Sequence, residues 1–138
     1  MKYFKFLMLF MFVGIFQACP VDDDEILVGT INIVNDSEET IYCGCLFVSE
    51  NVVNSDYFSE NVVREVKIPK KSEIRYSYYK NQFKGNYNNK IWILIFKQST
   101  LDNYSWEEIQ EQNIFDARYS FTLEELQAMN WEVVYTGE

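Results

Sequence analysis

The segment KIWILIFK, residues 90–97, contains six consecutive apolar side chains between two lysines. An uninterrupted apolar run of this length is typical of a strand that is buried on both faces. We therefore expect it to lie at the centre of a sheet, with a neighbouring strand on either side. This expectation assigns the chain to the mainly β class.

Six other segments are bounded by turn residues and are rich in β-branched or aromatic side chains, as strands are. They are residues 27–34, 40–48, 62–68, 73–79, 114–121 and 131–135. In 73–79 the side chains alternate, which puts Tyr78 and Tyr79 on opposite faces of the strand. The polar run NDSEE at 35–39 predicts a turn, and with it a hairpin between the first two strands.

Two helix starts occur in the last third of the chain. Ser105 with Glu108, and Thr122 with Glu125, have the spacing of a capping box, in which a hydroxyl and a carboxylate bind backbone N–H groups reciprocally. Turn signals recur about every ten residues before that, which favours a sandwich. The sequence thus predicts an immunoglobulin-like β-sandwich of about seven strands, with two short helices in the C-terminal third.

The composition limits the chemistry that the chain can perform. The 138 residues suit one domain with a proper core. Histidine is absent, which excludes Ser-His-Asp and Cys-His nucleophiles and histidine-ligated zinc. Adjacent carboxylates such as Glu107 and Glu108 already have a structural reason in a capping box, so they do not indicate a glycosidase. We expect no catalytic residues, no metal and no cofactor.

The first eighteen residues have the pattern of a targeting segment. Lys2 and Lys5 flank the start of an apolar run at 6–16. A membrane span takes about twenty apolar residues, so this run better suits a signal peptide, with a short uncleaved anchor helix as the alternative. We expect a signal peptide at 1–18, an acidic tether at 19–26 and one β-sandwich domain at 27–138.

The junction FQACPVDDDE, residues 16–25, resembles the processing site of a bacterial lipoprotein. Ala18 and Cys19 match the lipobox, whose cysteine is lipidated, whereas Phe16 and Gln17 depart from its usual residues. The acidic run that follows resembles the export signal of surface lipoproteins of the Bacteroidota; it consists of Asp22, Asp23, Asp24 and Glu25. A solvated tether explains the same charges. The resemblance implies lipidation at Cys19 and a location at the outer membrane, facing the cell exterior.

The C-terminal segment 101–135 is also similar to part of small Bacteroidota lipoproteins. The similarity lies in the order of Ser105-Trp106, Arg118-Tyr119, a Thr-Leu-x-x-Leu helix at 122–126 and Trp131. It implies the same location and a β-sandwich, and it supplies no site residues.

Cys43-Gly44-Cys45 is the motif that most suggests redox chemistry. On a strand both thiols would point to one face, and outside the cytoplasm such a pair can close into a strained disulfide. The motif lacks the helix N-terminus that lowers a thiol pKa in redox proteins, and zinc would need two more ligands. We expect Cys43 and Cys45 to be small core residues, with a disulfide as the alternative.

The stretch RYSYYKNQFKGNYNNKIW, residues 75–92, combines aromatic rings with lysines and asparagines. Such rings can stack on sugars while the polar groups hydrogen-bond to them. The candidate ligand-binding residues are Tyr79, Lys84, Tyr87 and Asn88. Cross-strand packing is the alternative role for the aromatic residues in strands.

Charge is distributed unevenly along the chain. The formal net charge is −9, yet residues 66–101 contain eight cations and one acid. The fold could pair these cations with acidic neighbours, or they could form a basic patch for an anionic glycan or an acidic partner. The acidic total argues against nucleic acid. We therefore expect a lipid-anchored, non-catalytic surface lipoprotein that binds a glycan or an envelope protein, with a thiol-disulfide protein that uses Cys43 and Cys45 as the alternative.

Overall fold

The computed structural model describes residues 26–47, 54–80 and 90–138, which form a mainly β structure with four short α-helices. The strands are β1 (Leu27–Asn35), β2 (Ile41–Phe47), β3 (Lys67–Ile68), β4 (Ser72–Tyr79), β5 (Lys90–Lys97), β6 (Ala117–Thr122) and β7 (Glu132–Tyr135). The helices are α2 (Glu60–Glu65), α3 (Gln98–Asn103), α4 (Trp106–Glu111) and α5 (Leu123–Ala128), with a 3-10 turn, η2, at Ser55–Tyr57.

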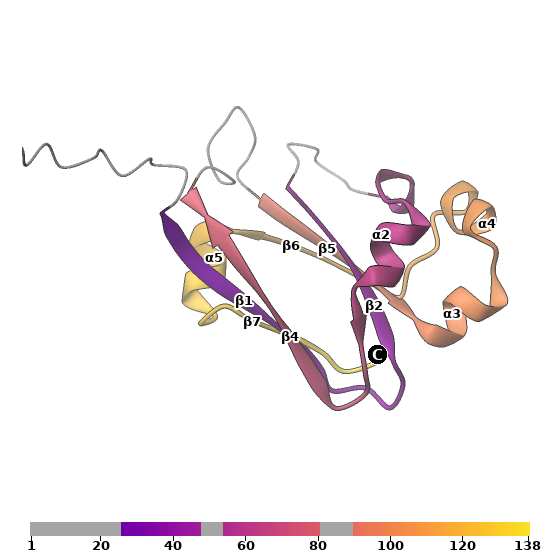
Figure 1. The fold of residues 1–138 in the computed structure, drawn as a ribbon, viewed down its shortest axis with the longest axis horizontal. Coiled ribbons are helices and arrows are strands. Elements are labelled where there is room, and N and C mark those ends of the chain that lie inside the picture. The colour runs from indigo at the N-terminus through magenta and orange to yellow at the C-terminus, as the bar shows by residue number, and fades with distance from the viewer. Residues whose placement is uncertain (1–25, 48–53, 81–89) are drawn as a thin grey trace, which may run out of the picture.

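The strands form two sheets (Figure 1). The smaller sheet has the order β4-β1-β7, in which β1 runs antiparallel to β4 and parallel to β7. The larger sheet has the order β3-β2-β5-β6, and all its neighbouring strands are antiparallel. Buried side chains from both sheets form one cluster, so the sheets pack face to face.

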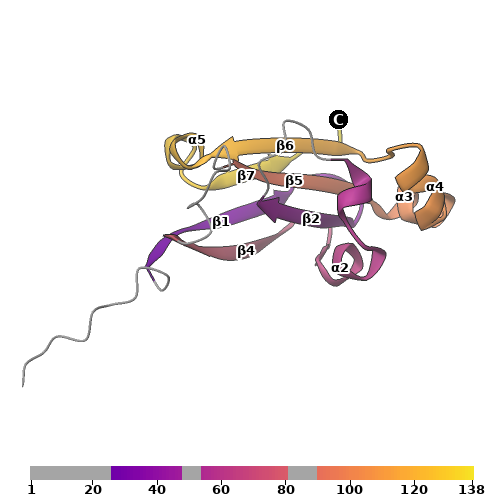
Figure 2. The same cartoon turned by 90° about the horizontal axis from the view of Figure 1, so that it is seen from above.

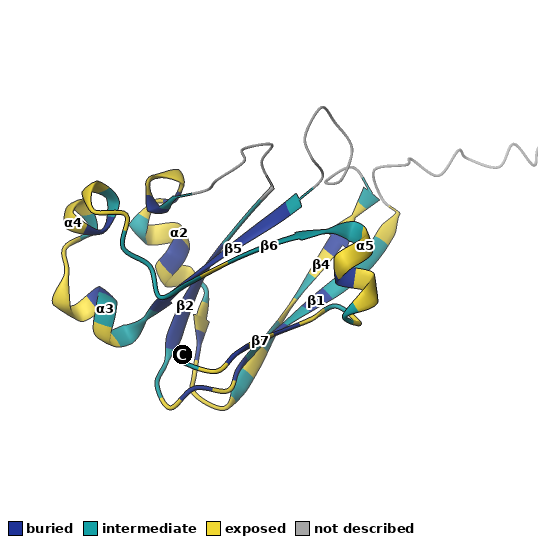
Figure 3. Cartoon of the chain, turned by 180° about the vertical axis from the view of Figure 1, so that it is seen from behind, coloured by how far each residue is buried: buried dark blue, intermediate teal, exposed yellow. Residues whose placement is uncertain are grey.

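The expected central strand is confirmed. β5 lies between β2 and β6, and its residues from Ile91 to Phe96 are all buried (Figure 3). Successive side chains of a strand point to opposite faces, so β5 contributes to two cores. Ile91, Ile93 and Ile95 point to one face, and Trp92, Leu94 and Phe96 point to the other.

The inter-sheet core lies between the two sheets. It is built mainly from isoleucine, with Ile31 and Ile33 of β1 facing the isoleucines of β5, and with Val133 and Tyr135 of β7 beside them. Leu126 of α5 closes this core at one end. Most of its members are β-branched, as is common where two pleated surfaces meet.

The helix-side core covers the other face of the larger sheet. Trp92, Leu94 and Phe96 of β5 pack there against Val63 of α2, Leu101 of α3 and Ile109 of α4. Figures 1 and 2 show these three helices gathered on one side of the molecule, whereas α5 lies apart from them. The described chain thus has three layers: the smaller sheet, the larger sheet and three short helices.

The expected hairpin between the first two strands is wrong. β1 and β2 belong to different sheets, and β2 pairs with β3 and β5 instead. The polar residues at 36–40 therefore form a connection from one sheet to the other. Neither strand can pair across a connection of this kind, because each already has partners within its own sheet.

The strand expected at 62–68 is also wrong, except for Lys67–Ile68. Residues 60–65 form α2, although Val62 and Val63 favour strands. The Arg64 guanidinium binds the Glu60 carboxylate at 2.6 Å, one helical turn away, and Val63 is buried in the helix-side core. Tertiary packing overrides local propensity here. No element was expected at 98–103, where Leu101 fixes α3 to the same core.

Both capping boxes are confirmed. The Ser105 and Thr122 side chains accept from the N–H groups of Glu108 and Glu125, and these two carboxylates accept from the cap N–H groups in return. The strand expected at 114–121 begins later, at Ala117, because Ile114 and Phe115 pack against the helix-side core.

The pairing registers define two ends of the molecule. At the upper end in Figure 1, β1 begins at Leu27 opposite Tyr79, and β5 begins at Lys90 opposite Thr122. At the opposite end, the turn end, lie the β1–β2 connection, the β3–β4 connection and the residues after β7. The candidate sites divide between these two ends.

Candidate functional site

The two cysteines of β2 point into the inter-sheet core, as the alternation of a strand requires. Cys43 is fully buried and Cys45 is half-buried, and their Sγ atoms lie 3.3 Å apart as free thiols. A hydrogen bond with Cys45, followed by burial, raises the pKa of the Cys43 thiol well above its ordinary value. The thiolate is the reactive form of cysteine, so this environment suits a core residue better than a nucleophile.

The tyrosines opposite these thiols belong to the same core. Burial, with a smaller contribution from the two cysteines, raises the pKa of both Tyr76 and Tyr78. Burial penalises the thiolate of Cys43 and the phenolates of Tyr76 and Tyr78 alike, so these three groups favour their neutral forms. These side chains therefore serve as core packing, and the two neighbouring thiols are also close enough to react with an oxidant.

The predicted ligand-binding stretch is only partly described. Tyr79 ends β4 at the upper end, where 42% of it is exposed. Lys84, Tyr87 and Asn88 lie outside the described residues, and so do Cys19 and the acidic run Asp22, Asp23, Asp24 and Glu25. Tyr79 precedes and Lys90 follows the undescribed part, so both of its flanks are at the upper end.

The cations of the basic stretch divide between the two ends. Among the described ones, Lys80 and Lys90 lie at the upper end, and Lys71 and Lys97 lie at the turn end. Arg75, on the outer face of β4, binds the Glu73 carboxylate at 2.6 Å. These positions favour cations paired within the fold over one continuous basic patch.

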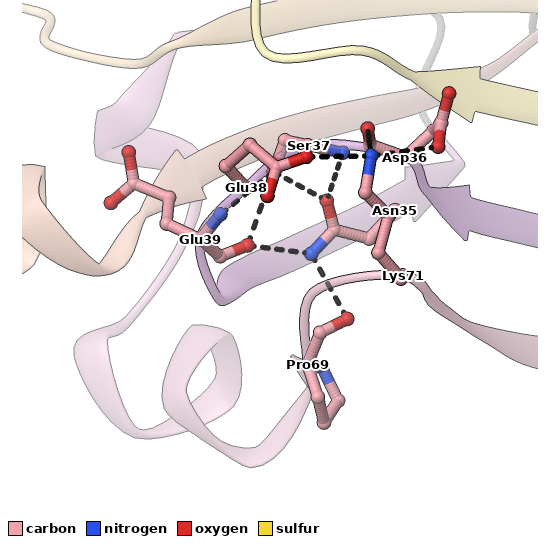
Figure 4. Close-up of polar contacts among 7 residues, drawn as sticks. All are labelled: Asn35, Asp36, Ser37, Glu38, Glu39, Pro69 and Lys71. Atoms are coloured by element: carbon pink, nitrogen blue, oxygen red, sulfur yellow. Dashed lines mark hydrogen bonds and ion pairs between the residues drawn. The ribbon is translucent and has the colours of Figure 1, made fainter.

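A network of polar contacts lies at the turn end, around the side chain of Asn35 (Figure 4). The side-chain nitrogen of Asn35, which is fully buried, donates to the carbonyl oxygens of Glu39, Ile68 and Pro69 at 2.8, 3.0 and 3.1 Å. Its side-chain oxygen accepts from the hydroxyl and the N–H of Ser37, at 2.6 and 3.1 Å. One amide therefore joins the two connections that cross between the sheets.

Lys71 covers this network from the solvent side. Its ammonium donates to the Asp36 carbonyl at 2.7 Å and lies 3.1 Å from the Asp36 carboxylate and 2.9 Å from the Glu38 carboxylate. These contacts raise the pKa of Lys71, and the hydrogen bond from Lys71 lowers the pKa of Glu38. Both groups are exposed to solvent, so the pairs orient the connections more than they stabilise the fold.

Two shallow grooves flank the network. The first, of about 360 Å³, is lined by Val34, Asn35, Asp36, Lys71, Ser72 and Glu73. The second, of about 250 Å³, is lined by Ser37, Glu38, Glu39, Lys97, Thr136 and Gly137. Each groove combines one lysine with two carboxylates and exposed backbone. Each groove therefore offers both signs of charge to a partner within a small area.

Sequence reasoning did not single out Asn35 or Lys71. The run Asn-Asp-Ser after an apolar strand is the signal of a side chain that binds its own backbone in a turn, and it predicted the turn correctly. It did not indicate that a second connection, at Pro69 to Lys71, would lie against the first. That proximity comes from the pairing of β2 with β3.

The described residues contain no group of three or more histidine, cysteine or carboxylate side chains that could hold a metal ion. Within the same ranges, no helix is both long and apolar enough to cross a membrane. No family model, no curated protein and no solved structure matches this chain.

Proposed function

We propose that the chain is a lipid-anchored lipoprotein of the outer membrane that displays a non-catalytic binding module at the cell surface. One observation supports this proposal above the others: β1 begins at Leu27, with only Ile26 between it and the acidic run that follows Cys19. A lipobox-like cysteine, a charged tether and a folded domain would then follow one another without a gap. The partner would be a glycan or another envelope protein.

The position of the tether decides which surface such a module presents. Residues 19–26 can extend to about 28 Å at most, so the upper end would stay close to the membrane. The flanks of the 81–89 segment, with its Lys84, Tyr87 and Asn88, lie at that same end. The turn end, with its two grooves, would point away from the membrane. This geometry favours the turn end, rather than the predicted aromatic stretch, as the partner-binding surface.

The turn end has suitable chemistry for a polar partner. Lys71 and Lys97 each lie beside carboxylates, so a partner meets both charges within a small area. The buried Asn35 network holds the two connections in place, and a preorganised surface loses less entropy on binding.

We further propose that the sandwich is immunoglobulin-like. The support for this proposal is the number of strands, since the seven described strands divide into sheets of four and three as in the constant-type fold. The order of the strands and the parallel pair of β1 and β7 depart from the all-antiparallel ABED and CFG sheets of that fold.

The anchor is tested by expressing the whole chain with a radioactive or clickable fatty acid. Cys19→Ala should abolish labelling and leave unprocessed precursor, whereas Cys43→Ala, the matched control, should label normally. If the Cys19→Ala protein is still labelled, the anchor assignment is wrong. Neutral substitutions at Asp22 to Glu25 should make the protein inaccessible to protease added to intact cells; unchanged digestion would leave the acidic run with only a tether role.

The partner-binding surface is tested with the lipidated protein on a glycan array and against envelope extracts. Lys71→Glu, which reverses one charge in a groove, should weaken a bound partner. Lys80→Glu at the upper end is the control and should not. The opposite pattern would assign binding to the upper end.

The alternative function, a thiol-disulfide protein, has one observation in its favour, the 3.3 Å between the Sγ atoms of Cys43 and Cys45. An oxidant would take two electrons and two protons from the pair as the S–S bond forms. Replacing both cysteines with Ala should leave sensitivity to oxidants unchanged if the pair is structural. An increase in sensitivity would support the redox role.

A further inference from the structure

Three apolar residues are exposed together at the upper end. They are Ile26, 38% exposed, Leu27, 55% exposed, and Tyr79, 42% exposed, and we call them the upper patch. Leu27 pairs with Tyr79 across β1 and β4, and the Lys80 N–H donates to the Ile26 carbonyl at 2.8 Å. Strand pairing thus places Leu27 and Tyr79 opposite each other, and the backbone hydrogen bond holds Ile26, the residue before Leu27, at the same end of β1 and β4.

The other large exposed apolar residues of the described chain belong to different elements. Val62 is on α2, Val134 is on β7, Tyr57 is in η2 and Tyr104 follows α3. Single apolar residues on a surface are ordinary and need no partner. The upper patch differs because its residues adjoin, and because Leu27 has the largest exposed fraction of the seven.

The charges around the upper patch are mixed. Lys80 and Lys90 lie at this end, and so do Glu124 and Glu125 in the first turn of α5. A mixed set of charges gives little net attraction to an anionic surface or a highly charged partner. An interface between water and lipid instead favours apolar side chains, a tyrosine with one polar end, and lysines that extend toward water.

The upper patch also lies where the expected anchor would hold it. Six residues lie between Cys19 and Ile26. The seven Cα-to-Cα steps from Cys19 to Ile26 span about 25 Å when the chain is fully extended. Because the tether is short, the effective concentration of membrane next to the upper patch is high. The patch would then contact the membrane for most of the time even if its affinity for lipid is weak.

We infer that the upper patch rests on the bilayer surface that holds the lipid anchor, so that the sandwich stands with its turn end outward. This inference rests on the proposed lipidation of Cys19. The upper patch is then a membrane contact, and Tyr79 is an interfacial residue rather than a glycan-binding one.

The test uses the lipidated protein on phosphatidylcholine vesicles, with a protease site inserted between Glu25 and Ile26 so that the same molecules can be released. Hydroxyl-radical footprinting with mass spectrometry compares Tyr79 with Tyr104, which is 43% exposed and serves as the internal control. A docked state favoured tenfold, equivalent to about 1.4 kcal/mol, lowers Tyr79 oxidation by about tenfold on vesicles. Release should restore the oxidation, and Tyr104 should not change.

Matched variants show whether the patch itself makes the contact. Leu27→Ser should bring Tyr79 oxidation on vesicles close to the released level. Val62→Ser, at a residue that is 50% exposed on α2, should leave the protection intact.

Three results would overturn the inference. Equal Tyr79 oxidation on vesicles and after release would mean that the patch does not dock. Protection that grows with the number of proteins per vesicle would assign the patch to a second copy of the chain. Protein that does not float with vesicles would remove the proposed anchor, and the inference with it. The first two results leave the anchor itself unaffected.

Discussion

The two faces of β5 belong to the same eight residues but lie in different cores. One face places isoleucines against the smaller sheet, and the other places Trp92, Leu94 and Phe96 under three short helices. Two sheets meet as flat pleated surfaces about 10 Å apart, where compact β-branched side chains fit. Short helices leave wider spaces that large rings fill. The comparison teaches that one strand can serve two kinds of packing when side chains that branch at Cβ alternate with side chains that do not.

The largest expected effect comes from emptying either core. Ile93→Ala should cost about 2 to 5 kcal/mol and Phe96→Ala about 3 to 5 kcal/mol, since both side chains are fully buried. Because the cores share β5, urea unfolding of each variant should remain a single transition with an unchanged slope. A separate early transition in Phe96→Ala alone would show that the helical layer unfolds independently.

The next effect distinguishes the inter-sheet core from the helix-side core by the pH dependence of stability. Burial, with smaller effects from Asp116 and other groups, raises the pKa of Tyr135 from 10.0 to about 12, and burial raises the pKa of Tyr76 and Tyr78 in the same inter-sheet core. Because the pKa of Tyr135 is higher in the folded state, its contribution to the free energy of unfolding is fully present below pH 10. That contribution is lost as the pH rises through about 12.

The measurement is the free energy of unfolding between pH 9 and 12, with tyrosinate absorbance recorded in parallel. Tyr135→Phe should reduce the loss of stability over this range. Tyr104→Phe, at an exposed position after α3, should not change it. If the two variants lose stability in parallel, burial in the inter-sheet core is not the cause.

A smaller effect comes from two glycines that have a ring packed on them, one for each core. A Cβ at Gly29 would come within 2.2 Å of the Trp131 ring, and a Cβ at Gly44 within 2.7 Å of the Phe58 ring. Gly29→Ala and Gly44→Ala should each cost about 1 to 3 kcal/mol by overpacking, with the larger loss at Gly29.

A double-mutant cycle checks the cause. Trp131→Leu should reduce the cost of Gly29→Ala and should leave the cost of Gly44→Ala unchanged. Additive effects at Gly29 and Trp131 would mean that the ring is not the obstacle. Chemical denaturation gives all the required free energies.

The smallest effect compares the two capping boxes. Ser105→Ala removes the cap of α4, which serves the helix-side core, and Thr122→Ala removes that of α5, which serves the inter-sheet core; each should cost about 1 kcal/mol. Ser105→Asp and Thr122→Asp keep an acceptor at the cap and should restore most of the loss. Failure of either Asp variant to recover stability would mean that the cap hydrogen bond is not what holds that helix.

The parts of the fold that depend on local chemistry could be predicted from the sequence. The bounds of β5, the alternation of β4 and both capping boxes follow from side-chain pattern within a few residues. The pairing of β1 and β2 could not be predicted, because the turn at 35–39 fits a hairpin and a crossing between sheets equally well. α2 could not be predicted either, because Val62 and Val63 favour strands and only the contact of Val63 with a distant core decides otherwise.

The candidate site was less predictable than the fold. Asn35 was recognised as a turn residue, but its three carbonyl partners include two that are more than thirty residues away. Lys71 was counted with a basic stretch, yet its partners are Asp36 and Glu38 from another connection. The alternation of 73–79 correctly put Tyr79 on the outer face. Tyr79 forms the upper patch together with Ile26 and Leu27. That patch depends on the pairing register of β1 with β4, which cannot be predicted from either segment alone.

The parallel pairing of β1 with β7 has a consequence for the order of folding. β1 is the middle strand of the smaller sheet, and one of its two partners is the last strand in the chain, a hundred residues later. The smaller sheet, and the inter-sheet core beneath it, can therefore be completed only after residue 135 has been synthesised. Contacts so distant in sequence slow folding. An emerging chain would therefore keep the smaller sheet incomplete, although all four strands of the larger sheet precede residue 123.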